Sequence, residues 1–100
     1  MEYWSMDRII RENQEKGRFF FSPGAMRFFR SRVHYHVYQG PGGIYFVTSE
    51  QGPHAPRLFT VRRFWPDTAK IDTWPDNNEF QVYRSRNGAH KAAMRAARGN

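Results

Sequence analysis

The first segment of the chain places hydrophobic and charged residues with the period of an α-helix. One face carries four residues at helical spacing: Met6, Ile9, Ile10 and Asn13. Charged residues on the opposite face form i,i+4 pairs, which stabilise an exposed helix. Because Ser5 is a suitable N-cap and Gly17 a suitable end, we predict an amphipathic helix between them.

The next segments predict a short second helix and a β-hairpin. Ser22-Pro23 places a capping residue before a proline, which favours a short helix from Gly24 to about Ser31. Val33–Tyr38 alternates in the manner of a strand, and Ile44–Ser49 is rich in residues with strand preference. Gly40-Pro41-Gly42-Gly43 separates the two runs, so we expect a turn there and antiparallel pairing of the strands.

The second half of the chain completes an α+β pattern. Arg57–Trp65 predicts a third strand, and Lys70–Trp74 a further short one; Phe80–Tyr83 is either another strand or the approach to the last helix. We therefore expect a single small basic domain over residues 1–100. It would hold an antiparallel sheet of three to four strands, with the N-terminal, short second and C-terminal helices packed on one face.

The C-terminal segment predicts the most regular element. Ser85 or Asn87 is suited to cap the helix, and Gly99 to end it. At 100° per residue one arc of this helix is entirely alanine: Ala89, Ala92, Ala93, Ala96 and Ala97. Lys91, Arg95 and Arg98 point in nearly the opposite direction. The small face would approach a sheet closely, leaving a basic stripe toward solvent.

The charge of the chain is concentrated in two stretches without acidic residues. The formal net charge is +7. Residues 17–49 contain arginine, and residues 80–100 contain arginine and one lysine, but neither stretch contains Asp or Glu. The first of these stretches also contains many aromatic residues. Arginine forks bind phosphate and aromatic rings stack on bases, so the pattern favours a nucleic-acid partner, DNA or RNA. An acidic protein partner would fit the same charge.

These considerations predict a non-catalytic nucleic-acid-binding protein that contacts phosphates through an arginine-rich surface. The candidate contact residues are Arg84, Arg86, Lys91, Arg95, Arg98, Arg27, Arg30 and Arg32. We predict no catalytic residue, metal ligand or cofactor from the sequence. The chain has no cysteine and no run of about 20 apolar residues. With no visible signal peptide either, we expect a cytoplasmic protein that does not enter the membrane.

Two resemblances add to this interpretation. Residues 84–93, Arg84-Ser85-Arg86-Asn87-Gly88-Ala89-His90-Lys91-Ala92-Ala93, resemble the start of the last helix in the double-stranded RNA-binding domain, which runs helix, three antiparallel strands, helix; the paired lysines of that family are absent here. Residues 25–29, 45–50, 60–62 and 80–83 look similar to a group of small uncharacterised phage-encoded proteins. This second resemblance implies a phage accessory role.

Two alternative functions remain open at this stage. A phage-encoded protein could bind and inhibit a host or defence factor instead of nucleic acid. His34 and His36, with Arg32 and Tyr38 nearby, could instead form the acid–base pair of a small metal-independent ribonuclease. The sequence leaves enzymatic activity undecided but favours a binding protein.

Overall fold

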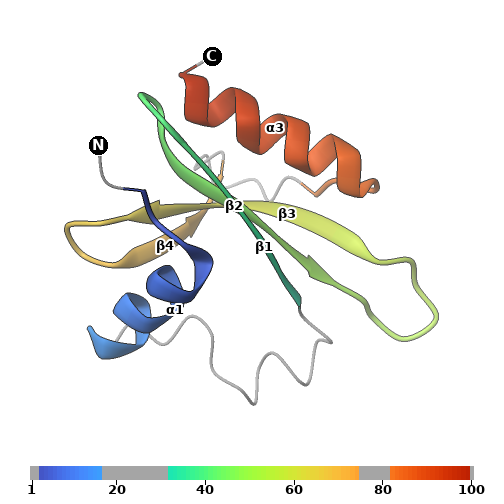
Figure 1. Cartoon of the computed structure of the whole chain (residues 1–100). Coiled ribbons are helices and arrows are strands. Elements are labelled where there is room, and N and C mark those ends of the chain that lie inside the picture. Colours follow the sequence, from blue (N-terminus) through green and yellow to red (C-terminus); the bar gives the residue numbers. More distant parts are fainter. Residues whose placement is uncertain (1–2, 17–31, 75–81, 100) are drawn as a thin grey trace.

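The computed structural model describes residues 3–16, 32–74 and 82–99, which form two helices and a four-stranded sheet (Figure 1). The sheet is entirely antiparallel, with the strand order β1-β2-β3-β4. The elements are α1 Met6–Glu15, β1 Arg32–Gly40, β2 Gly43–Glu50, β3 Leu58–Trp65, β4 Lys70–Thr73 and α3 Arg86–Arg98. The predicted α+β class and the antiparallel sheet are confirmed, whereas the short helix predicted for Gly24–Ser31 lies outside the described residues.

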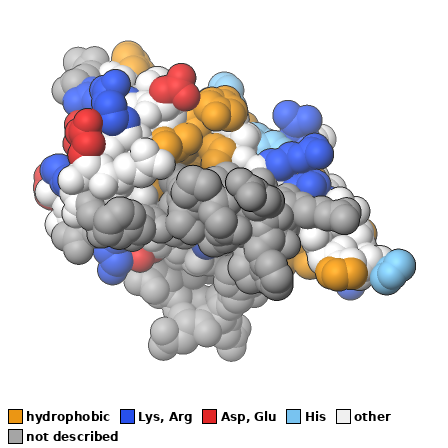
Figure 2. Space-filling view, turned by 90° about the horizontal axis from the view of Figure 1, so that it is seen from below, with side chains coloured by type: hydrophobic (Ala, Val, Ile, Leu, Met, Phe, Trp, Pro, Cys, Tyr) orange, Lys and Arg blue, Asp and Glu red, His pale blue; other side chains and the backbone are white. Residues whose placement is uncertain are grey.

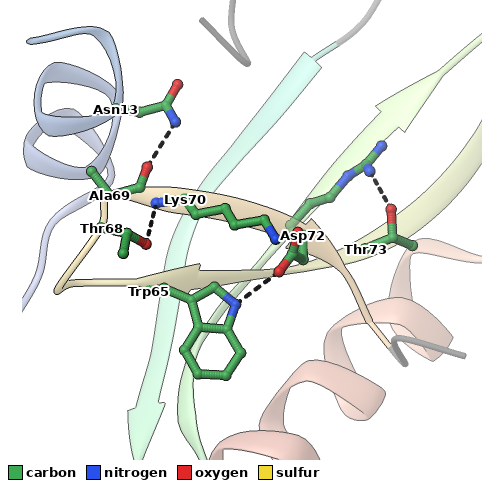
Figure 3. A network of polar contacts seen from close by, with 8 residues as sticks. Asn13, Trp65, Thr68, Ala69, Lys70, Asp72 and Thr73 are labelled. Atoms are coloured by element: carbon green, nitrogen blue, oxygen red, sulfur yellow. Dashed lines mark hydrogen bonds and ion pairs between the residues drawn. The ribbon is translucent and has the colours of Figure 1, made fainter. Parts of the chain in front are cut away.

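Helix α1 has the cap and the buried face that its sequence predicts. The Ser5 hydroxyl accepts a hydrogen bond from the backbone N–H of Arg8 at 3.2 Å. Met6, Ile9 and Asn13 are buried. The buried Asn13 side chain donates to the carbonyl of Ala69 at 2.9 Å, which ties α1 to the β3–β4 turn (Figure 3). This bond removes the cost of burying an amide without a partner.

The two helices cover opposite faces of the sheet, because neighbouring residues of a strand point to opposite sides. Met6 and Ile9 of α1 pack with Ile44 and Phe46 of β2, among others. The alternating residues Tyr45 and Val47 pack instead with the alanines of α3. Figure 1 shows α1 and α3 on the two sides of the sheet. The prediction that the helices share one face is therefore wrong, since alternation in β2 gives each face its own apolar surface.

Strand β1 is irregular in its middle. His34 lies opposite Val47, but Tyr38 lies opposite Tyr45, so β1 has three residues where β2 has one. Extra residues in one strand disrupt pairing and redirect side chains. Here they leave Tyr35 and His36 both exposed.

Helix α3 lies unusually close to the β1–β2 turn. The N–H of Gly42 donates to the carbonyl of Ala97 at 2.9 Å. A Cβ on Gly42 would clash with the carbonyl oxygen of Ala96 and lie 2.8 Å from the nitrogen of Gly99. The predicted turn and the buried alanine face are both confirmed, and together they fix the position of α3 on the sheet.

The opposite edge of the sheet is held by a network of polar contacts (Figure 3). The indole N–H of Trp65 donates to Asp72 at 3.0 Å, and the Lys70 ammonium lies 3.4 Å from the same carboxylate. Further inside, Arg62 donates to Thr73 at 2.7 Å and to Thr48 at 3.0 Å. Lys70, Asp72 and Arg62 thus each have a polar partner within the sheet.

Candidate functional site

Four ring side chains gather where β1 passes the first turns of α3. The rings of His34 and His90 lie 5.5 Å apart, edge to face. The hydroxyl of Tyr38 lies 2.8 Å from Nδ1 of His90, and the ring of His36 lies 4.4 Å from the ring of Tyr38. We call these four residues, His34, His36, Tyr38 and His90, the histidine cluster.

Local structure explains how residues so distant in sequence meet. His34 and Tyr38 lie opposite Val47 and Tyr45, which face α3. The helix itself begins at a capped position, because the Ser85 hydroxyl accepts from the N–H of Gly88 at 2.9 Å. The alanine face then sets α3 close to the sheet, which brings His90 onto β1.

A serine and an arginine extend the cluster on the sheet side. Nε2 of His34 lies 3.1 Å from the hydroxyl oxygen of Ser49, which is buried on β2. The same oxygen accepts a hydrogen bond from Arg57 at 2.9 Å. Since Arg57 supplies a donor to that oxygen, the hydroxyl proton of Ser49 is available to the imidazole of His34.

The electrostatic environment of His34 favours its neutral form. Burial is the main cause that lowers the pKa of His34, and the charges of Arg86, His90, Arg57 and Arg32 lower it further. The three arginines come from α3, the loop before β3 and the start of β1. A site with several converging cations disfavours another positive charge and attracts an anion.

His90 experiences a similar environment. Burial lowers the pKa of His90, and Arg86 and His36 lower it further. Its Nε2 atom is buried and has no hydrogen-bond partner in the described structure. For Tyr38, burial raises the pKa of the phenol while the charge of Arg86 opposes this rise. Arg86 therefore acts on three of the four members of the histidine cluster across two elements.

The predicted contact residues fall into three groups. Arg32 and Arg86 are exposed beside the histidine cluster. Arg84 and the helix residues Lys91, Arg95 and Arg98 are exposed along α3, which confirms that the basic stripe faces solvent. Arg27 and Arg30 lie outside the described residues.

Three residues of the site, Arg57, His90 and Ser49, were missed by the sequence prediction. Arg57 was assigned only to a strand, and His90 lies between the alanine face and the basic stripe of α3. The sequence paired His34 with His36 because they alternate on one strand. In the structure the imidazole packed against His34 is that of His90, and His36 lies within the irregular part of β1.

The two halves of the surface in Figure 2 differ in their charge. Lys, Arg and His side chains lie in the right half of this view with no visible acidic side chain among them, whereas the left half, on the side of α1 and β4, mixes acidic side chains with Lys and Arg. Among the described residues, no group of three or more His, Cys, Asp or Glu could hold a metal ion. In the same part of the chain, no helix is long and apolar enough to span a membrane.

Comparison with known proteins identifies a family but no activity. Residues 5–94 match the model of a family of unknown function, DUF7447. This match spans most of the chain. The protein belongs to that family. No curated protein and no solved structure matches the chain.

Proposed function

We propose that this DUF7447 protein binds nucleic acid by its phosphates at the cationic site formed by Arg32, Arg57, Arg86 and the histidine cluster. The observation that carries the proposal is the convergence of these three arginines on His34. Each belongs to a different segment, so the fold, and not one basic run of sequence, creates the positive site. Phosphate contacts of this kind supply sequence-independent affinity.

The site offers several kinds of donor to a phosphate. Guanidinium groups bind phosphate oxygens through forked N–H donors, and imidazole or hydroxyl groups add single hydrogen bonds. The exposed residues Lys91, Arg95 and Arg98 continue the positive surface along α3. On a longer strand these three side chains would contact the phosphates next to the site.

A salt titration with charge-matched variants tests this proposal. Affinity for an oligonucleotide should fall steeply with salt, because bound phosphates release counterions. In the triple variant R32Q/R57Q/R86Q the slope of log K against log salt should become shallower by about 2–3, at roughly 0.7–0.9 per lost phosphate contact. The control R11Q/K16Q/K70Q removes the same charge from exposed positions elsewhere and should keep most of the slope.

Two results would overturn the proposal. Phosphate contacts are strongest at low salt, so a failure to bind an oligonucleotide at 50 mM salt would exclude nucleic acid as the partner. Equal losses in both triple variants would show that net charge matters and the site does not. Recovery of one acidic protein in stoichiometric amount after nuclease treatment would then favour the alternative of a protein-binding inhibitor.

A metal-independent ribonuclease is the second candidate, and the contact of His34 with Ser49 and His90 favours it. The lowered pKa of His34 keeps its imidazole neutral, so its acceptor nitrogen could exchange the Ser49 hydroxyl for the 2′-hydroxyl and take that proton as the 2′-oxygen attacks phosphorus. A second group must then protonate the departing 5′-oxygen. Cleavage of RNA that persists unchanged in H34Q, or the absence of any cleavage, excludes this candidate.

A further inference from the structure

A second concave surface lies beside the cationic site, between the N-terminal segment and the edge of β1. This open hollow has a volume of about 450 Å³, and four of its lining residues carry rings: Tyr3, Trp4, Tyr35 and His36. This volume lies in the range of small-molecule sites, which commonly combine aromatic walls with a few polar groups. The outer edge of β1 forms one wall, because β1 is an edge strand of the sheet.

One wall of this pocket is held in place by several contacts. The backbone N–H of Trp4 donates to the side-chain oxygen of Gln39 on β1 at 3.0 Å. The ring of Trp4 lies 4.9 Å from the ring of Phe64 in the core, and the guanidinium of Arg8 lies 3.8 Å from its centre. These contacts prepare the wall before any ligand arrives.

The other walls carry rings that the core does not use. Tyr3 is 75% exposed and Tyr35 is 65% exposed, the two most exposed large hydrophobic side chains in the described structure. Tyr35 lies in the irregular part of β1, and both it and the neighbouring His36 are exposed. Exposed rings around a concavity form a stacking surface for a flat ligand.

His36 connects the pocket to the cationic site. Its ring lines the pocket and also lies against the ring of Tyr38, whose hydroxyl contacts His90. The pocket lies on the α1 side of the β1 edge and the cationic site on its α3 side, so a nucleotide strand that passes around this edge at His36 would contact both.

We infer that the protein binds single-stranded nucleic acid, with an unpaired base stacked on Tyr35 and Tyr3 in the pocket whose wall Trp4 forms, and with phosphates at the cationic site. This inference rests on the proposed function and specifies the form of its ligand. In a duplex the faces of the bases are covered by their stacked neighbours, so only a single strand or an extruded base can occupy such a pocket.

The test compares Y35A with Y35F on three ligands: oligo-dT, an abasic strand of equal length, and a duplex. Y35A should weaken oligo-dT binding about tenfold, the effect of losing one stacked base, without changing the salt slope. Y35F keeps the ring and should bind like the parent protein. The abasic strand, which keeps the phosphates, should bind the parent and Y35A equally and should respond only to R32Q/R57Q/R86Q.

The outcomes separate the two proposals. If Y35A and the parent protein bind oligo-dT equally while R32Q/R57Q/R86Q binds more weakly, the base pocket is wrong and the phosphate site stands. Tighter binding of the duplex than of oligo-dT would likewise overturn the pocket. If the parent protein binds none of the three ligands, both proposals fail.

Discussion

The two edges of the sheet use the same kinds of charged residue for different purposes. At the β4 edge, Asp72 accepts from Trp65 and lies 3.4 Å from Lys70. At the β1 edge, the charged groups that act on His34 are three arginines and another histidine, within the part of the chain described. The first arrangement pairs opposite charges within the hairpin, whereas the second brings several positive charges together around His34.

Two arginines illustrate the contrast. Arg62 is 7% exposed, donates to two threonines and lies 3.8 Å from Glu50, so its charge supports the fold. Burial lowers the pKa of Arg62, and Glu50 opposes that shift. Arg86 is exposed, and its charge lowers the pKa of His34 and His90. An arginine in this chain is therefore informative about function only when its surroundings are known.

The largest effect on the β1 edge should come from G42A. The new methyl group would clash with the backbone of α3, which cannot rotate away as a side chain could. We expect a loss of about 3 kcal/mol in the free energy of unfolding, at the upper end for overpacked sites. Urea denaturation measures it, and the histidine cluster should open because His90 moves with α3.

The control for this variant is G52A. A methyl group on Gly52 would meet only the Cβ of Ala55, at 4.0 Å, in an exposed loop. Its effect should stay within about 0.5 kcal/mol. A G42A protein as stable as G52A would show that the close contact between the turn and α3 does not hold the helix in place.

The sequence predicted the regular elements well because local signals determine them. The cap at Ser5, the turn around Gly42 and the alanine face of α3 all depend on neighbouring residues, and all are confirmed. The site was predicted only in part, since it depends on which segments meet. Nothing near Arg57 or His90 in the sequence indicates that both lie against β1.

The prediction that the helices pack on one face of the sheet was wrong for a related reason. Each strand residue belongs to one face, but β2 is hydrophobic on both, from Ile44 to Val47. Such a run is compatible with helices on one side or on two. The packing of α1 against Ile44 and Phe46 places the two helices on opposite faces. This contact joins segments far apart in the sequence, so no local pattern predicts it.

Arg62 and Arg86 provide the next test of the comparison. R62M keeps an unbranched apolar chain but removes the hydrogen bonds to Thr48 and Thr73, and we expect a loss of about 2 kcal/mol in stability. R86M should change stability by less than about 0.5 kcal/mol, because Arg86 is exposed. Thermal or urea unfolding of both variants measures the difference.

The functional outcomes of these two variants should be reversed. R86M should weaken oligonucleotide binding and reduce its salt dependence, whereas folded R62M should bind like the parent protein. If R62M weakened binding more than R86M at a temperature where both are folded, the division between a structural and a ligand-binding edge would be wrong.

The smallest expected effect is a dependence of stability on pH that arises at the β1 edge. An unfolded histidine titrates near pH 6.5, and the pKa of both His34 and His90 is lower than this in the folded protein. Between the folded and unfolded pKa values the unfolded chain binds more protons, so the free energy of unfolding falls as the pH drops below about 6.5. The stability that comes from keeping these two histidines neutral is fully present above that pH. Because both side chains are partly exposed, the loss should be smaller than that caused by R62M.

Binding should respond to the same protons in the opposite direction. A phosphate beside His34 would favour its protonated form, so affinity for an oligonucleotide should rise as the pH falls from 7.5 to 5.5. One added charge at contact distance contributes about 1 kcal/mol even in water, or roughly fivefold in affinity. The variant H34Q/H90N keeps hydrogen-bonding groups near Ser49 and Tyr38 but does not titrate, and it should lose both pH effects. If the binding effect persisted unchanged in this variant, it would come from a group other than His34 and His90, and the anion would not bind beside these two histidines.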